Sequence, residues 1–143
     1  MKRILVIDDE QLLLDLLTQL LSKIGYEVDQ AIDCRKAAGL LKERGYDAIF
    51  LDVKMPLMDG IGFYDKVQSH FPEMAKRIIF LTGDVANRTT ADFIKKTGSL
   101  YLQKPFTIKE IKAILNLLFD SAASPNPLEK DNPSLRFNPL SLQ

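Results

Sequence analysis

The sequence has a single cysteine, Cys34, and no long hydrophobic run. One cysteine excludes an internal disulfide and any metal site built from several cysteines, and it suits the reducing cytoplasm. We expect Cys34 to serve as a small residue near a helix start. Met1-Lys2-Arg3 is followed by only four apolar residues and then by three acids, which is far too short for a signal peptide or a membrane span. We therefore expect a cytoplasmic protein without a targeting segment.

The chain also lacks an excess of either charge. Lysine and arginine together number 19, and aspartate and glutamate together number 19, so the formal net charge is zero. A neutral chain has no bulk electrostatic attraction to nucleic acids or membranes. With 143 residues, 46% of them hydrophobic and 27% charged, it is an ordinary globular chain with room for one domain. Any function must therefore come from local charge.

Continuous apolar runs predict three strands that are buried on both faces. Residues 4–7, 48–51 and 78–81 are such runs, and each ends on a polar residue. Residues 26–31 alternate apolar and polar side chains, as expected of a strand near a sheet edge. Residues 100–102 add a short fifth strand.

Five helices are predicted between and after these strands. Gly25, Gly45 and Gly98 follow periodic apolar segments, as glycine commonly does just past a helix end. Thr107 and Glu110 form a capping box that opens the last helix. The predicted helices lie over residues 12–24, 35–44, 61–71, 86–97 and 108–118. Alternating strands and helices predict an α/β fold, a doubly wound parallel sheet with right-handed crossovers.

The apolar stripe of each helix predicts the face that it buries. The first helix has Leu12, Leu13, Leu16, Leu17, Leu20 and Ile24, and the last has Ile108, Ile111, Leu115 and Leu118. The stripe of residues 86–97 rests mainly on Ala91, Phe93 and Ile94. We expect this helix to be thinly anchored and able to shift.

Polar residues follow four of the strands and are candidates for one site. Asp8 and Asp9 follow the first strand, Asp52 ends the third, and Thr82 and Lys104 follow the fourth and fifth. The carboxyl ends of parallel strands line one rim of a sheet, so these side chains can converge. Crowded carboxylates repel one another unless a cation lies among them, and Mg²⁺ prefers oxygen ligands. A lysine and a threonine can bind the remaining oxygens of a phosphoryl group.

The chain resembles a response-regulator receiver domain of two-component signalling from Lys2 to about Ser121. The motifs that carry the resemblance are Asp8-Asp9, Asp52 with Met55-Pro56 and Asp59-Gly60, Thr82, Tyr101 and Lys104-Pro105-Phe106. The resemblance implies a flavodoxin-like sheet of five strands in the order 2-1-3-4-5, with five helices. It implies a signalling domain that catalyses only its own phosphorylation and dephosphorylation.

The resemblance also implies which residues bind the metal and accept the phosphoryl group. Asp52 is the implied phosphoacceptor. Asp9 and Asp52 are the implied direct ligands of Mg²⁺ or Mn²⁺, together with the backbone carbonyl of Lys54, and Asp8 assists through water. A phosphohistidine on a partner kinase would supply the phosphoryl group in a near in-line displacement.

A conformational switch is implied at the ends of the last two strands. Lys104 pairs with the phosphoryl group or with Asp52, and Thr82 moves to bond a phosphoryl oxygen. Tyr101 then swings inward to fill the space that Thr82 leaves. The Lys104-Pro105 peptide bond is implied to be cis. The added charge can thus bias a bistable element, for which residues 86–97 and the fifth strand are the candidates.

The implied partners are a sensor histidine kinase or a histidine phosphotransfer protein. Self-association through the fourth helix, fifth strand and fifth helix is also implied, although Ser99-Leu100 replaces the acidic pair of receivers that dimerise through a charged face. Residues 81–84, 96–98 and 101–106 resemble instead the receivers at the C-terminal end of hybrid sensor kinases. We expect no direct binding to nucleic acid or membrane, because the short C-terminal segment cannot form a helix-turn-helix.

Two other classes of protein remain as alternatives. A flavodoxin-type cofactor binder shares the fold, but its first corner must donate N–H groups to a phosphate, which Asp8-Asp9-Glu10 would repel. A haloacid-dehalogenase-like phosphatase also uses an aspartate nucleophile, but it needs an acid where this chain has Lys54. Flavin absorbance or steady turnover of a phosphomonoester would favour these alternatives respectively.

Two further expectations concern the rim and the end of the chain. In receivers, the residues two positions after the phosphoacceptor and two after the threonine flank the approach of water to the phosphorus, and here they are Lys54 and Asp84. We expect their opposite charges to pair, with a strength of at most about 1 kcal/mol, and so to hinder hydrolysis. Residues 122–143 hold Pro125, Pro127, Pro133 and Pro139 among serines and asparagines, which predicts a tail or linker outside a receiver domain of residues 1–121.

His70 has no second histidine nearby and is expected to be structural or solvated.

Overall fold

The computed structural model describes residues 1–53, 60–83 and 87–120. The chain forms two compact units, Met1–Ile79 and Phe80–Gln143. Five strands form a sheet in the order β2-β1-β3-β4-β5, as the resemblance implied.

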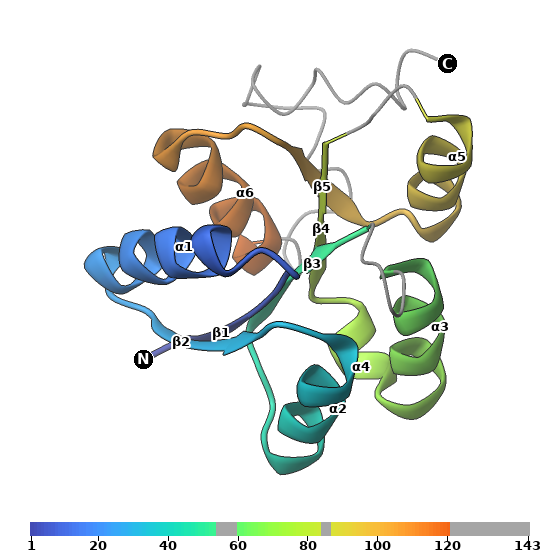
Figure 1. The fold of residues 1–143 in the computed structure, drawn as a ribbon, viewed down its shortest axis with the longest axis horizontal. Coiled ribbons are helices and arrows are strands. Elements are labelled where there is room, and N and C mark those ends of the chain that lie inside the picture. The colour runs from blue at the N-terminus through green and yellow to red at the C-terminus, as the bar shows by residue number, and fades with distance from the viewer. Residues whose placement is uncertain (54–59, 84–86, 121–143) are drawn as a thin grey trace. The chain divides into compact units, whose positions relative to one another are not determined.

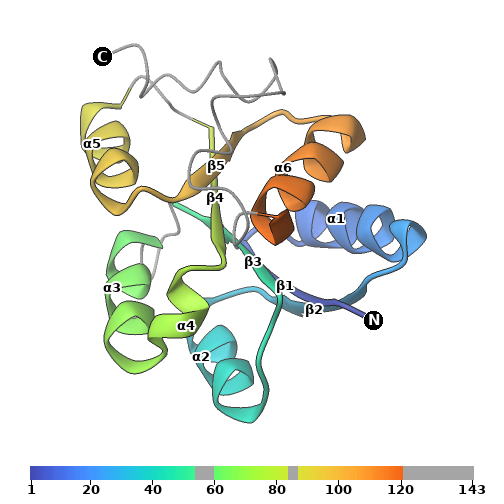
Figure 2. The same cartoon turned by 180° about the vertical axis from the view of Figure 1, so that it is seen from behind.

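The described residues of the first unit form three complete strands and four helices. These are β1 (Arg3–Ile7), α1 (Gln11–Ile24), β2 (Glu27–Ala31), α2 (Cys34–Glu43), β3 (Ala48–Asp52), α3 (Gly60–His70) and α4 (Pro72–Ala75). β1 pairs in parallel with both β2 and β3, so that Ile4 lies between Val28 and Ala48. α1 covers one face of these strands, and α2 and α3 cover the other (Figures 1 and 2). Both faces are thus shielded from water.

The second unit contains the remaining elements, and β4 (Ile78–Thr82) crosses the boundary between the units. The others are α5 (Arg88–Thr97), β5 (Leu100–Gln103) and α6 (Ile108–Asp120). Phe93 of α5 packs edge to face on Phe80 of β4, with ring centroids 5.2 Å apart. This contact supplements the short stripe of α5, whose buried residues are Thr90, Ala91 and Ile94.

The three continuous apolar runs behave as predicted. Every residue of β3 and β4 is buried, and in β1 only Arg3 is partly exposed. β2 carries one exposed and three half-buried residues, in keeping with its edge position. Burial on both faces explains why the central strands contain no alternation of polar and apolar residues.

The predicted helix ends are confirmed at two glycines and wrong at the third. Gly25 and Gly98 lie in the left-handed region, with φ of 114° and 71°, and cap α1 and α5. Gly45 has no such role, because α2 ends at Glu43 and is followed by Arg44, whose backbone is extended with φ of −158°. The chain therefore leaves α2 without the reversal that favours glycine.

Side chains cap two other helices. The capping box at α6 is confirmed, since the Glu110 N–H donates to Thr107 Oγ1 at 3.1 Å and the Thr107 N–H donates to Glu110 Oε1 at 2.9 Å. Asp33 accepts from the Lys36 N–H at 2.8 Å and caps α2, whose first residue is the buried Cys34. Cys34 is thus a small residue at a helix start, as expected.

The buried faces of α1 and α6 differ from the predicted stripes. α1 buries Leu14, Leu17 and Leu21, whereas Leu12 and Leu16 are 84% and 48% exposed. Leucines occur all round this helix, so spacing alone fits more than one face. α6 buries Ile111, Ile114, Leu115 and Leu117, while Ile108 is 37% exposed. α4 was not predicted; it is a single turn that begins at a proline, which fits the first helical position.

Candidate functional site

Three carboxylates meet at the carboxyl ends of β1 and β3. Asp8 and Asp9 follow β1, and Asp52 ends β3, its parallel neighbour. One carboxylate oxygen from each of the three lies within 4.8 Å of the others. Asp8 is fully buried and Asp52 is 6% exposed, whereas Asp9 is exposed. The predicted acidic cluster is therefore confirmed, with one of its members open to solvent.

Backbone hydrogen bonds hold Asp8 in place. Its N–H donates to the Ala31 carbonyl at 3.2 Å, which extends the pairing of β1 with β2 past the strand end. Its Oδ1 accepts from the Glu10 N–H at 2.9 Å, at the start of α1. A helix N-terminus carries a partial positive charge, so it favours the carboxylate. The Glu10 N–H serves an aspartate here, which argues against the phosphate-binding corner of a flavodoxin-type cofactor site.

Gly60 brings the start of α3 against the end of β3. Its N–H donates to the Val53 carbonyl at 2.8 Å. A Cβ at this position would overlap the Asp52 carbonyl oxygen and lie 2.8 Å from Val53 Cα. Only glycine fits so close an approach of two backbone segments. In the sequence, Gly60 stood out only as part of the Asp59-Gly60 motif, and its contact with the Asp52 backbone was not predicted.

In the second unit, the backbone joins Thr82 to Lys104. The Lys104 N–H donates to the Thr82 carbonyl at 2.8 Å. Thr82 is 3% exposed, and Lys104 is half-buried. Tyr101 of β5 is 5% exposed, and the Lys104-Pro105 bond is cis, as the resemblance implied. These residues take their predicted places at the ends of β4 and β5.

Several expectations lie outside the described residues. They are the Lys54 carbonyl, the pairing of Lys54 with Asp84, and the tail of residues 122–143. Met55-Pro56 and Asp59, which contribute to the resemblance, lie outside them too. His70 ends α3, is exposed, and has Nδ1 3.0 Å from the Lys66 carbonyl oxygen, which confirms its structural or solvated role.

The acidic cluster has the chemistry of a site for a hard divalent cation. Ligand oxygens on Mg²⁺ lie about 2.1 Å from the ion, and so at most about 4.2 Å from one another. The three carboxylate oxygens lie within 4.8 Å of one another, which exceeds that limit, so their spacing fits two direct ligands and a third that acts through water. Buried like charges also repel one another, and a cation relieves the repulsion. The donor set and its spacing therefore fit a magnesium-type ion.

At the other end of the same strands, a buried tyrosine contacts a partly buried aspartate. Tyr46, which is 1% exposed, donates from its hydroxyl to Asp29 Oδ2 at 2.6 Å. Arg44 pairs with the same oxygen at 3.4 Å, and Arg77 donates to the Tyr46 carbonyl at 2.7 Å. Burial and the hydrogen bond to Asp29 raise the pKa of Tyr46 well above its usual value. The sequence did not indicate this network.

No helix among the described residues is both long and apolar enough to cross a membrane.

Comparison with known proteins places the chain in a family. The profile of the response regulator receiver domain matches residues 4–116. The probable transcriptional regulator ycf27 of Cyanophora paradoxa is 36% identical over 126 residues, which are 87% of this chain and 51% of that protein. The chain spans about half the length of the first curated relatives that it matches.

Solved structures of receivers have the same fold. The response regulator TrrA of Thermotoga maritima, in complex with Mg²⁺ and BeF, is 31% identical with a TM-score of 0.72, over 82% of this chain and 99% of that one. A CheY-like receiver domain protein of Methanospirillum hungatei is 27% identical with a TM-score of 0.76, over 86% of this chain and 98% of that one. Receivers are signalling domains rather than conventional enzymes. With its acidic cluster and its sheet order, the chain belongs to the response regulator receiver domain family.

Proposed function

We propose that Asp52 accepts a phosphoryl group from a phosphohistidine in a magnesium-dependent step. The observation that carries this proposal is the clustering of Asp8, Asp9 and Asp52 at one end of β1 and β3. Among the three, Asp52 belongs to a fully buried central strand, and its backbone abuts Gly60. A carboxylate on such a support is positioned as a nucleophile, because packed strands fix geometry more firmly than loops do.

The acidic cluster would hold the magnesium ion. Asp9 and Asp52 would bind directly, together with the Lys54 carbonyl, and Asp8 would act through water. The bound ion would neutralise charge on the phosphoryl oxygens during transfer. The likeness to TrrA, a receiver solved with Mg²⁺ and BeF, supports this assignment.

The chain's own groups would carry the transfer and the response to it. An Asp52 carboxylate oxygen attacks phosphorus, the phosphorus–nitrogen bond of the donor breaks, and the donor imidazole keeps the electron pair. Lys104 would balance charge on the product, and the Thr82 hydroxyl would bond one of its oxygens. Tyr101 would follow Thr82 inward, and α5 with β5 would change position. Each of these roles rests on the match to the family's motifs.

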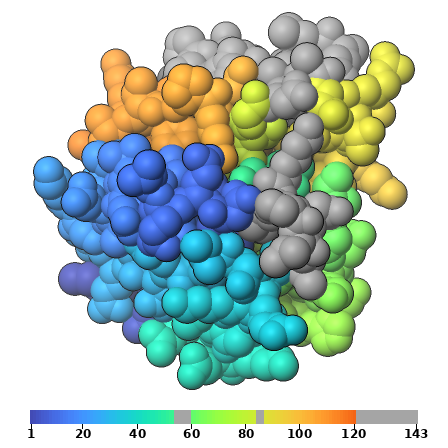
Figure 3. Space-filling view, viewed as in Figure 1, coloured from blue at the N-terminus to red at the C-terminus, as the bar shows by residue number. Residues whose placement is uncertain are grey.

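A helical partner fits the surface beside Asp9. α1 begins directly after the acidic cluster, and its Leu12 and Leu16 are exposed one turn apart. Figure 3 shows α1 lying at the surface on this side of the molecule. Exposed leucines next to a reactive group favour docking of an apolar helix face. The proposed partner is a sensor histidine kinase or a histidine phosphotransfer protein; self-association through α5, β5 and α6 remains a prediction.

Phosphorylation with a small donor tests the proposal. Wild-type protein incubated with phosphoramidate and Mg²⁺ should gain the mass of one phosphoryl group, and Asp52→Asn should gain none. Asp33→Asn is a matched control, because asparagine can also cap α2, and it should be modified at the wild-type rate. Uptake by Asp52→Asn at the wild-type rate would remove Asp52 from its proposed role.

A further inference from the structure

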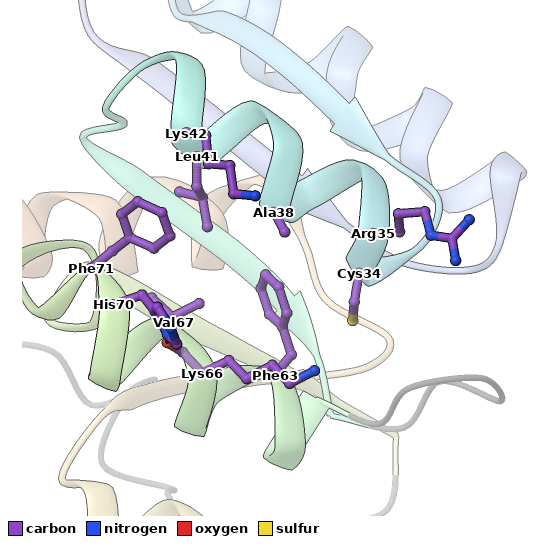
Figure 4. A pocket seen from close by; sticks show the side chains of 10 residues that line it. All are labelled: Cys34, Arg35, Ala38, Leu41, Lys42, Phe63, Lys66, Val67, His70 and Phe71. Carbon is purple, nitrogen blue, oxygen red and sulfur yellow. Dashed lines mark hydrogen bonds between the residues drawn. The ribbon is translucent and has the colours of Figure 1, made fainter.

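A cavity of about 360 Å³ lies between α2 and α3, on the face of the first unit away from α1. Its floor is apolar and includes Leu41, Phe63, Val67 and Phe71. Figure 4 shows the rings of Phe63 and Phe71 directed into the space between the two helices, with Leu41 and Val67 near Phe71. A volume above about 300 Å³ with a mainly apolar lining is typical of a small-molecule site.

Positive charge surrounds this apolar floor. Lys42 comes from α2 and Lys66 from α3, on opposite sides of the cavity (Figure 4). Arg35 also contributes to the lining, with its guanidinium turned outward. None of these three pairs with a carboxylate in the part of the chain that the structure describes. None of the described residues that line the cavity is acidic, so this part of the lining favours an anion.

We propose that this cavity binds a small organic carboxylate with an aromatic or short aliphatic body. The apolar body would rest between Leu41 and Phe63, where it leaves water. The carboxylate would lie at the rim, where the ammonium groups of Lys42 and Lys66 can each donate to one of its oxygens. Long lysine stems run along apolar surface while their charged ends stay in water, which suits a ligand with an apolar body and a charged end.

The cavity is linked to the phosphorylation site through α3. Phe63 lies one turn after Gly60, and the Gly60 N–H is bonded to the Val53 carbonyl at 2.8 Å. A ligand that shifts α3 would therefore press on the backbone next to Asp52. An effect on phosphorylation rests on the proposed function, whereas binding itself does not. Binding can be measured without a phosphodonor, so the result is independent of that function.

Fluorine NMR with trifluoromethyl-benzoate as the probe tests the site. The neutral comparison ligand is trifluoromethyl-benzyl alcohol, which has the same apolar body without the charge. We expect the benzoate to bind more tightly by up to about fivefold for each lysine that it contacts, which is the upper contribution of an exposed ion pair. Its binding should shift the amide NMR signals of Leu41 and Phe63.

Variants of the lining residues test the contributions of charge and of cavity space to binding separately. Lys42→Gln and Lys66→Gln should each weaken the benzoate by about threefold to fivefold and leave the alcohol unchanged. Lys36→Gln, on the same helix but outside the lining, is the matched control and should have no effect. Ala38→Leu fills the cavity and should abolish binding of both ligands; the lysine variants keep the test decisive if that variant does not fold.

The proposal would be overturned by no binding of the benzoate at millimolar concentration, by equal binding of the alcohol, or by amide shifts centred away from α2 and α3. Equal loss in Lys36→Gln would also overturn it, because the effect would then be one of net charge.

Discussion

The charged side chains at the two ends of β1, β2 and β3 are arranged differently. At the acidic end, Asp8, Asp9 and Asp52 bring three like charges within 4.8 Å. At the paired end, the charged side chains meet an opposite charge or a hydrogen-bonding group. Its ion pairs and hydrogen bonds join Arg3 to Glu27, Arg44 and Tyr46 to Asp29, and the Arg3 N–H to Asp47.

The contrast separates residues that serve function from residues that serve stability. Crowded like charges cost stability, so a chain that gathers them must use them with a cation or a charged group. Opposite charges and buried hydrogen bonds in the same three strands need no ligand. The comparison predicts that changes at the paired end weaken folding alone. Removing charge at the acidic end should abolish function and leave folding intact or stronger.

Gly60→Ala tests how tightly the acidic end is packed, and it should have the largest effect. Its Cβ would overlap the Asp52 carbonyl oxygen and lie 2.8 Å from Val53 Cα, and these backbone atoms cannot rotate away. We expect a loss of about 3 kcal/mol in the free energy of unfolding, measured by urea denaturation. Gly39→Ala is the control, because nothing lies within 4 Å of its Cβ, and it should gain about 0.5 to 1 kcal/mol as a helix substitution. Equal stability of the two variants would contradict the close approach.

Tyr46→Phe tests the paired end. It removes a buried hydroxyl that bonds Asp29 at 2.6 Å, so we expect a loss of about 1.5 kcal/mol at neutral pH. A double-mutant cycle with Asp29→Asn should show that most of this loss depends on the pair. Phosphorylation of Tyr46→Phe should match wild type. A lowered phosphorylation rate in folded Tyr46→Phe protein would break the separation between the two ends.

The pH dependence of stability sharpens this prediction. The pKa of Tyr46 is raised in the folded protein, so the protonated form is favoured there and its contribution is complete below the unfolded pKa of 10.0. Above pH 10 the contribution falls, at up to about 1.4 kcal/mol per pH unit. Wild type should thus lose stability faster than Tyr46→Phe as pH rises above 10. Parallel pH profiles of the two proteins would contradict the raised pKa.

At the acidic end, Asp9→Asn should stabilise the folded protein, whereas Gly60→Ala and Tyr46→Phe should destabilise it. Without divalent metal, removing one of three crowded charges should raise the free energy of unfolding by about 0.5 kcal/mol, as expected for an exposed group. Mg²⁺ should raise the melting temperature of wild type and of the control Glu43→Gln, because it binds the folded state, and should leave that of Asp9→Asn unchanged. A wild-type response to Mg²⁺ in Asp9→Asn would remove this residue from the metal site.

The Arg3–Glu27 pair should show the smallest effect. Its side chains are 38% and 50% exposed, so this ion pair, with an N–O distance of 3.1 Å, should contribute only about 0.3 kcal/mol to the free energy of unfolding. Arg3→Gln should lower stability by about that amount, and less in 1 M salt than in dilute buffer. A loss above 1 kcal/mol would show that surface pairs at this end do more than the comparison allows.

The sequence predicted the acidic end better than the paired end, for a physical reason. A strand buried on both faces must be continuously apolar, so the first carboxylate after it stands out, as Asp8 and Asp52 do. Tyr46 and Asp29 meet only because β2 and the segment before β3 flank β1, and nothing in their spacing marks the pair. The cavity between α2 and α3 likewise depends on packing that spacing does not specify.

The buried faces of the helices were harder to predict from the spacing of apolar residues. α1 has leucines at almost every position from Leu12 to Leu17, so several faces are apolar, and the sheet decides that Leu14 and Leu17 are buried. The helix end predicted at Gly45 was wrong for a related reason, because a glycine after a helix permits a reversal of the chain without requiring one. Gly60 could be marked as a turn residue, but its contact with Asp52 needed coordinates.

The most direct test of the account is to locate the phosphoryl group in unaltered protein. Wild type would be phosphorylated with acetyl phosphate and Mg²⁺, reduced with borohydride to convert the acyl phosphate to an alcohol, digested and sequenced by mass spectrometry. The account predicts conversion at Asp52 alone, and none when EDTA replaces Mg²⁺. Conversion at Asp8 or Asp9 in place of Asp52, or conversion that does not depend on the metal, would contradict it.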